Sequence, residues 1–152
     1  MQVYKVGRTK YAHDLTGEGA RLFGGRWNKQ LTSCIYTSES RSLAVLEYTV
    51  NVNIEEIPRA LSITTFDIAI DQLQVLSIED LPGNWRQSPA PSSTKDFGTE
   101  FLKRAVLPVI RIPSCIILQE YNFLLNPNHA SSKHFTIINV EDFVYDVRIK
   151  LI

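Results

Sequence analysis

The order of the expected secondary-structure elements most limits how this 152-residue chain can fold. Segments rich in β-branched and aromatic residues predict strands at 33–38, 60–68, 108–114, 115–125, 135–140 and 143–149. Apolar residues at helical spacing predict helices at 38–52, with Ser38 or Ser40 as the cap, and at 96–106. Strands outnumber helices and do not alternate strictly with them. The pattern therefore favours an α+β fold with a mixed sheet over a doubly wound nucleotide-binding fold.

The length and composition fit one domain over residues 1–152. The proline-rich stretch 81–98 is interpreted as a surface connection inside that domain, because both flanks are needed to complete a core. Lys plus Arg and Asp plus Glu are 16 each, so the basic excess typical of nucleic-acid-binding proteins is missing. The N-terminus carries charges where a signal peptide is apolar, and no apolar run is long enough to span a membrane. A cytoplasmic location is expected.

Patterns for metal binding or for a serine-hydrolase triad are not found in the sequence. Cys34 and Cys115 have no partner cysteine or histidine at metal-ligand spacing, and both are expected to be small buried residues. The histidines, His13, His129 and His134, lie in polar or turn-like contexts, and no GxSxG motif is present. Triad chemistry is therefore disfavoured.

Glu47 is the acidic residue whose position most suggests chemistry. It lies four residues after Leu43 and three before Val50, on the apolar stripe of the expected helix. A carboxylate on such a face is costly unless it is paired or lines a cavity. Glu47 is therefore either an ion-paired or rim residue or a catalytic carboxylate in a cleft.

The only Gly-Gly pair, Gly24 and Gly25, directly precedes Arg26, Trp27 and Asn28. Glycine permits backbone conformations and close approaches that a Cβ forbids. An arginine after such a turn can present its planar guanidinium to a phosphate or a carboxylate. The alternatives are a solvent-facing turn arginine, a core tryptophan and a turn asparagine.

Tyr36 and Ser114 are two further candidates, each at the end of an expected strand. Tyr36 shortly precedes the helix that carries Glu47, so this strand and helix are expected to pack together. The structural alternatives are a half-buried core tyrosine with a satisfied hydroxyl and a strand-end turn serine.

Four motifs, taken together and in this order, closely resemble the RES-domain family of bacterial toxins. They are GEGARLFGGRWN (17–28), IYTSESRSLAVLE (35–47), IPS (112–114) and NFLLNPNH (122–129), and the resemblance runs from about Tyr4 to Arg148. The Arg, Glu and Ser that name the family fall at Arg26, Glu47 and Ser114, with a tyrosine at Tyr36.

The resemblance implies a fold similar to the ADP-ribosyltransferase toxins, with a split mixed sheet and flanking helices, and NAD as the substrate. It implies cleavage of the nicotinamide–ribose bond by hydrolysis or phosphorolysis, with inorganic phosphate as co-substrate in the latter, and no metal or other cofactor. It further implies a helix-turn-helix antitoxin of the Xre type as partner and a homodimer within a larger toxin–antitoxin complex. Direct nucleic-acid or membrane binding is not expected.

The chemistry implied by the family suits these residues. Loss of nicotinamide leaves an oxocarbenium-like sugar, as in glycoside hydrolysis, and the cationic nicotinamide leaves as a neutral molecule without a general acid. Glu47 is expected to stabilise the sugar cation, Arg26 to hold phosphate or ribose oxygens, Tyr36 to contact the nicotinamide–ribose end, and Ser114 to hydrogen-bond nearby. The residues expected to bind substrate around them are Lys5, Asn28, Asn122 and Asn126.

Three positions depart from the family pattern. Lys5 stands where an arginine is frequent, Leu31 where a glycine commonly follows the GGRWN turn, and Asn51 where a histidine often follows the helix of Glu47. These departures leave open a shifted substrate pose, a weakened enzyme or a catalytically inactive module that binds its antitoxin. A separate alternative is a mono-ADP-ribosyltransferase acting on a protein. An RNA-cleaving toxin is disfavoured by the zero net charge.

Overall fold

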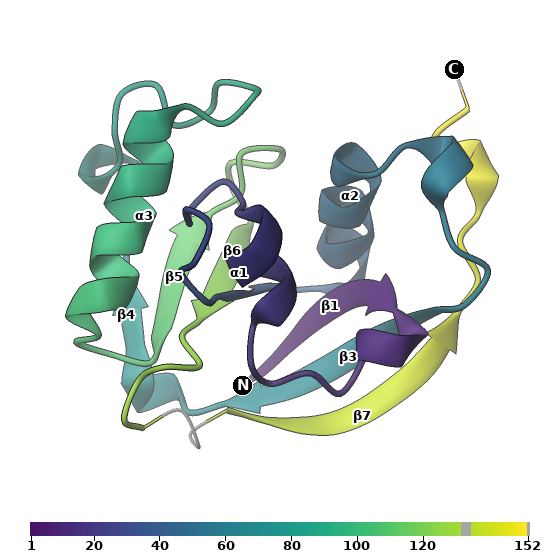
Figure 1. The fold of residues 1–152 in the computed structure, drawn as a ribbon, viewed down its shortest axis with the longest axis horizontal. Helices are drawn as coiled ribbons and strands as arrows, with labels where there is room; N and C mark the ends of the chain where they lie inside the picture. Colours follow the sequence, from purple (N-terminus) through teal and green to yellow (C-terminus); the bar gives the residue numbers. More distant parts are fainter. Residues whose placement is uncertain (132–134, 152) are drawn as a thin grey trace.

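The computed structural model describes residues 1–131 and 135–151, and it has the α+β architecture expected from the sequence (Figure 1). The strands are β1 Gln2–Arg8, β2 Ile35–Ser38, β3 Leu61–Ile68, β4 Leu73–Val75, β5 Val109–Pro113, β6 Tyr121–Leu125 and β7 Phe135–Phe143. The helices are α1 Glu18–Phe23, α2 Arg41–Asn51 and α3 Ser92–Arg104, with short 3-10 turns between several of the elements.

The strands form one seven-stranded mixed sheet in the order β4-β5-β6-β2-β1-β3-β7. β4 runs parallel to β5, and the other neighbouring pairs are antiparallel. β1 pairs with β3 along its whole length but with β2 at one position, Tyr4 opposite Ser38. The sheet is therefore split at this seam into the halves β4-β5-β6-β2 and β1-β3-β7.

Three apolar clusters hold the layers together. One joins α3 and the GGRWN turn to β5 and β6, and it contains Trp27, Trp85 and Leu102. A second joins the two halves of the sheet and includes Phe66 of β3 and Phe123 of β6. The third seats α2 on β1 and β3. In Figure 1, α3 accordingly lies beside β4 and β5, while α2 lies toward β1 and α1 stands between them.

Several predicted elements differ from the structure. α3 begins at Ser92, inside the stretch expected as a connection, and Pro91 precedes its first turn. Residues 115–118 do not form a strand, because the Ser114 hydroxyl accepts hydrogen bonds from the amides of Ile116 and Ile117 and turns the chain. The segment 143–149 leaves the sheet after Phe143. β1, α1 and β4 were not predicted: α1 contains Gly19 and β4 has three residues, so their patterns are weak.

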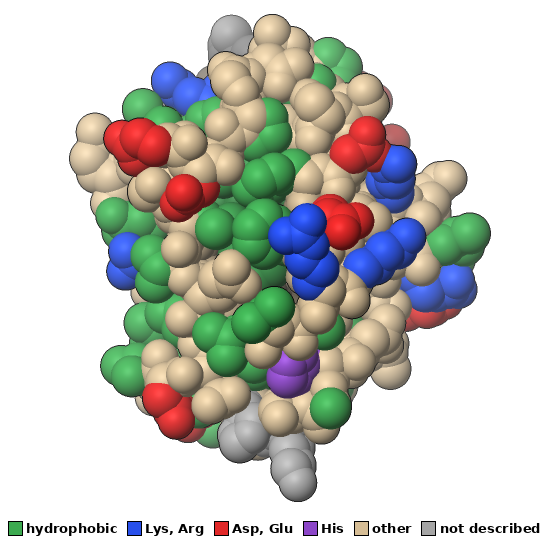
Figure 2. Space-filling view, turned by 90° about the vertical axis from the view of Figure 1, so that its left-hand side faces the viewer, with side chains coloured by type: hydrophobic (Ala, Val, Ile, Leu, Met, Phe, Trp, Pro, Cys, Tyr) green, Lys and Arg blue, Asp and Glu red, His purple; other side chains and the backbone are tan. Residues whose placement is uncertain are grey.

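The surface features agree with the balanced composition. Figure 2 shows the side of α3 and β4, where Lys and Arg side chains lie next to Asp and Glu and hydrophobic side chains fill much of the rest. Within residues 1–131 and 135–151, no helix combines the length and the hydropathy needed to cross a bilayer.

Candidate active site

Glu47 projects from the middle of α2, toward the ends of β2, β5 and β6. The helix starts where predicted, since the Ser40 side chain accepts a hydrogen bond from the Leu43 amide at 3.0 Å and caps it. Leu43 and Ala44 are buried against the sheet, whereas Glu47 is half-buried and Val50 is exposed. The predicted apolar stripe thus ends at Glu47, which stands at the rim of the core.

Neutral side chains hold the Glu47 carboxylate. Its Oε1 accepts a hydrogen bond from Ser114 Oγ at 2.8 Å and another from Asn122 Nδ2 at 2.6 Å. Ser38 Oγ donates to Asn122 Oδ1 at 2.7 Å and thereby fixes which way the amide faces. Glu47 Oε2 accepts no hydrogen bond from the described residues, and Glu47 forms no ion pair with them. The ion-paired alternative is therefore not what the structure shows.

The sheet explains why these side chains meet. Asn122 pairs with Ser38 across β6 and β2 and with Ile112 across β6 and β5. Ser114 follows β5 directly, and its amide donates to Glu120 O at 2.8 Å, so the β5–β6 connection is tight. Ser114 is fully buried and is both a strand-end turn serine and a donor to Glu47. The interpretation of Ser114 as a turn residue and its interpretation as a site residue are therefore compatible.

Glycine is required at the two positions of the GGRWN turn for different reasons. Gly24 has φ +69°, a left-handed conformation that favours glycine. At Gly25, a Cβ would lie 2.6 Å from the hydroxyl of Tyr36, so the residue must be glycine for the turn to approach this side chain. The Tyr36 hydroxyl accepts from Trp27 N at 2.9 Å and donates to Asn28 Oδ1 at 2.6 Å.

Asn28 is fully buried, and its Nδ2 donates to the carbonyls of Ala20, Lys29 and Thr32. Both ends of the Asn28 amide are therefore engaged inside the protein, so in this structure it positions the turn and does not face a ligand. Burial raises the pKa of the Tyr36 hydroxyl well above its usual range, which keeps that group a neutral donor.

Arg26 is anchored at one end of its guanidinium. Nη1 donates to Trp85 O and to Gln87 O, both at 2.8 Å, and this fixes the loop before α3 against the turn. Nε and Nη2 make no hydrogen bond with the described residues, and the side chain is half-buried. Arg26 thus combines a structural contact with donors that a ligand could use.

The thiol of Cys115 is affected by charges from both the GGRWN turn and the Glu47 cluster. Burial raises the pKa of its thiol, the Arg26 charge lowers it, and the Glu47 charge raises it. Arg26 and Glu47 therefore both lie within electrostatic reach of Cys115, which follows Ser114 in the chain. The position next to Ser114 was the signal in the sequence that could have indicated this.

Lys5 and Asn126 do not lie beside the Glu47 carboxylate. Tyr4 pairs with Ser38, so the next residue, Lys5, points to the other face of the sheet. Burial lowers the pKa of Lys5, and the charge of Asp14 opposes that shift. Asn126 follows the opposite end of β6 from Asn122, about 13 Å away at the usual rise per residue. These two predicted substrate-binding residues thus lie apart from the carboxylate.

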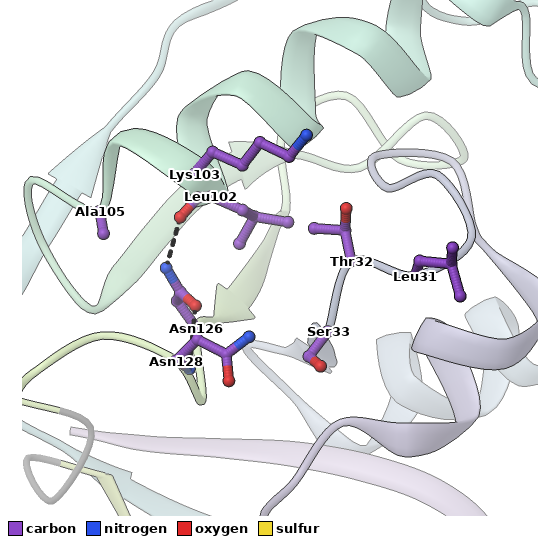
Figure 3. A pocket seen from close by; sticks show the side chains of 8 residues that line it. All are labelled: Leu31, Thr32, Ser33, Leu102, Lys103, Ala105, Asn126 and Asn128. Atoms are coloured by element: carbon purple, nitrogen blue, oxygen red, sulfur yellow. Dashed lines mark hydrogen bonds between the residues drawn. The ribbon is translucent and has the colours of Figure 1, made fainter.

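Asn126 instead supports a separate cavity of about 250 Å³ (Figure 3). Its Nδ2 donates to Leu102 O at 2.8 Å, which ties the end of β6 to the end of α3. The lining comprises Leu31, Thr32, Ser33, Leu102, Lys103, Ala105, Asn126 and Asn128. The cavity lies at the end of β2 and β6 that is remote from Glu47.

Ser38 is a further residue that shapes the surroundings of Glu47, and it is not among the site residues predicted from the sequence. It was considered as a helix cap, whereas its hydroxyl orients Asn122 toward Glu47. Its position at the end of β2 was the available signal. No group of three or more His, Cys, Asp or Glu side chains that could hold a metal ion is found in residues 1–131 and 135–151.

Comparison with known proteins assigns the family. The family model described as "RES domain" matches residues 2–146. The chain belongs to the RES-domain family. "Toxin Res" of Yersinia enterocolitica is 34% identical over 152 residues, covering 99% of this chain and 100% of the relative. "Prs ADP-ribosylating toxin" of a Sphingobium strain is 33% identical over 144 residues, covering 93% of this chain and 89% of the relative.

The fold of this RES domain is also seen in a solved structure. A chain from the crystal structure of the M. tuberculosis MbcT–MbcA toxin–antitoxin complex superposes with a TM-score of 0.68 at 18% identity, covering 93% of the present chain and 83% of that one. This likeness confirms the predicted fold class.

The RES domain's departures at Leu31 and Asn51 have structural counterparts. Leu31 has φ +72° and is largely exposed, so a leucine occupies a left-handed position that favours glycine, the residue that the resemblance leads one to expect there. Asn51 donates from Nδ2 to Glu47 O at 2.8 Å and closes the last turn of α2. Neither residue hydrogen-bonds the Glu47 carboxylate.

Proposed function

We propose that this RES domain is the toxin of a toxin–antitoxin pair and that it cleaves the nicotinamide–ribose bond of NAD. The observation that carries the proposal is the Glu47 carboxylate, which is fixed by Ser114 and Asn122 without a paired cation. A carboxylate held in this way keeps its negative charge available for a cation that develops beside it. The relatives named "Toxin Res" support the toxin assignment.

In the proposed reaction, the bond between the ribose C1″ and the nicotinamide nitrogen breaks, and its electron pair leaves with neutral nicotinamide. Glu47 stabilises the oxocarbenium-like sugar through Oε2, the oxygen that has no partner within the described residues. An acceptor oxygen then bonds to C1″ and gives up its proton to the carboxylate. Arg26 binds phosphate or ribose oxygens through Nε and Nη2, while Tyr36 presents its half-buried ring to the substrate.

A second candidate is transfer of ADP-ribose to a protein. It is favoured by the 33% identity to the relative named "Prs ADP-ribosylating toxin". Bond cleavage at C1″ is the same in both candidates, and the acceptor differs. The structure of the M. tuberculosis toxin–antitoxin complex supports an antitoxin as partner, which we propose to be a helix-turn-helix protein that blocks this site. The proposed place of action is the cytoplasmic NAD pool.

The test is to incubate purified protein with NAD, with and without inorganic phosphate, and to follow nicotinamide release and the sugar product. Free ADP-ribose indicates water as acceptor, a phosphorylated ADP-ribose indicates phosphate, and label on an added protein indicates transfer. The matched pair of variants is Glu47→Gln and Glu56→Gln, since the Glu56 side chain is exposed and makes no hydrogen bond or ion pair with the described residues. We expect Glu47→Gln to lose at least about a hundredfold in rate, and Glu56→Gln to lose none.

Equal nicotinamide release by the wild type and Glu47→Gln contradicts the catalytic proposal. If neither protein releases nicotinamide, growth arrest that is the same in both supports the inactive, antitoxin-binding alternative. Growth arrest with intact NAD and degraded RNA indicates a different toxin activity.

A further inference from the structure

Arg111, on β5, has no hydrogen-bond acceptor or ion-pair partner for its guanidinium among the described residues. Its Nε is buried and has no hydrogen-bond partner in the described residues, and none of its nitrogens forms an ion pair with them. Arg111 Cζ lies 4.1 Å from the centre of the Tyr121 ring, so the guanidinium stacks on an aromatic face. A buried N–H without an acceptor is costly, and native structures rarely leave one unsatisfied.

Arg111 and Tyr121 line a depression of about 220 Å³ at the β4 edge of the sheet. Much of the remaining lining is apolar, and it includes Ile78 and Leu118. Glu79 also lines the depression; it is exposed and makes no ion pair with Arg111. The volume is below the roughly 300–1,000 Å³ typical of pockets for drug-sized ligands, so a dinucleotide does not fit.

This depression is separate from the Glu47 site. Asn122 points toward Glu47, so its neighbour Tyr121 points to the other face of β6. Arg111 pairs with Phe123, which shares that face with Tyr121. The residues of the proposed catalytic centre do not line the depression.

We propose that this depression binds a small organic carboxylate. The planar guanidinium of Arg111 matches the two oxygens of a carboxylate, and stacking on Tyr121 holds it in place before the ligand arrives. Ile78 and Leu118 pack against the apolar part of the ligand. Inorganic phosphate has no apolar part to contact Ile78 and Leu118, so the lining favours the organic carboxylate.

The test is an NMR titration of the wild-type protein with benzoate and, separately, with inorganic phosphate. We expect saturable shifts from benzoate at residues 75–79, 111 and 121, and weaker binding of phosphate. Arg111→Gln should weaken benzoate binding by roughly ten- to a hundredfold, since it removes charge-assisted hydrogen bonds. Arg59→Gln, which removes the same charge at an exposed position, should not change it.

Glu79→Gln gives a readout that does not depend on the stability of an Arg111 variant. It should tighten benzoate binding about two- to fivefold, because a rim carboxylate no longer opposes the anion. The proposal is overturned by benzoate shifts that do not saturate, by tighter binding of phosphate than of benzoate, or by unchanged binding in Glu79→Gln. Nicotinamide release is not used as a readout, so failure here and failure of the proposed NAD chemistry are distinguishable.

Discussion

The Glu47 cluster and the GGRWN turn are both polar, but they direct their hydrogen bonds differently. Around Glu47, two side chains, Ser114 and Asn122, donate to one oxygen of the carboxylate, and Ser38 orients Asn122. The other carboxylate oxygen has no partner in the described residues. In the turn, Asn28 and the Tyr36 hydroxyl bond to each other and to backbone groups. The first arrangement leaves one oxygen of the Glu47 carboxylate free to contact a ligand, and the second stabilises the conformation of the GGRWN turn. Arg26 combines the two arrangements. Its Nη1 anchors a loop, whereas Nε and Nη2 have no hydrogen-bond partner in the described residues.

Asn122→Asp should break the Glu47 cluster most strongly. It replaces the donor 2.6 Å from Glu47 Oε1 by a second carboxylate, and the two cannot both stay ionised at that distance. The pair then has a raised pKa in the folded protein, so the native state binds more protons than the unfolded one. The free energy of unfolding should therefore decrease as the pH rises through the raised pKa.

We expect NAD cleavage by Asn122→Asp at neutral pH to fall by about 10²- to 10³-fold and to recover partly at lower pH. Asn128→Asp, which adds the same charge at an exposed position beyond the other end of β6, is the control. A pH-independent loss would show that charge repulsion is not the cause.

Gly98→Ala should break the packing of the turn against α3. A Cβ at Gly98 would lie 2.0 Å from Trp27 O, so either the helix or the turn must move. We expect a loss of about 3 kcal/mol in the free energy of unfolding, measured with denaturant. Gly19→Ala is a matched control on another helix, since nothing lies within 4 Å of its added Cβ, and it should gain about 0.5–1 kcal/mol. Equal effects of the two changes would refute the steric explanation.

Tyr36→Phe separates support of the turn from contact with substrate. It removes the partner of Trp27 N and of Asn28 Oδ1, and should cost about 1–3 kcal/mol of stability. The ring stays, so the folded variant should keep its rate of NAD cleavage well below its melting temperature. A rate loss greater than about tenfold in folded protein would show that the hydroxyl itself acts in the reaction.

Ala105→Gly should have the smallest effect. Ala105 follows α3 with φ +49°, a left-handed helix end where glycine is preferred. We expect a gain of about 1 kcal/mol in thermal or denaturant unfolding and no change in NAD cleavage. A loss of stability would mean that the methyl group contributes more by packing than it costs in backbone strain.

The sequence was most informative where local residue spacing alone determines the structure, as in a helix and its cap. The spacing around Glu47 and the serines before α2 predicted the helix and its rim carboxylate, and the structure confirms the Ser40 cap. The burial of Asn28 could not be predicted, because it depends on how the turn folds back onto Ala20, Thr32 and Tyr36. The direction of Lys5 could not be predicted, because it depends on strand pairing between residues distant in sequence. β4 was missed because three residues are too few to show an alternating pattern. The roles of the site residues stay predictions until the variants are measured.

The Glu47 cluster lies across the seam at Tyr4 and Ser38, where the two halves of the sheet meet. α2 is seated on β1 and β3, whereas Ser114 and Asn122 belong to the other half of the sheet. Their hydrogen bonds to Glu47 therefore link α2 to the other half of the sheet across this seam. A ligand that draws the carboxylate away from Ser114 and Asn122 therefore also removes a contact between the two halves of the sheet.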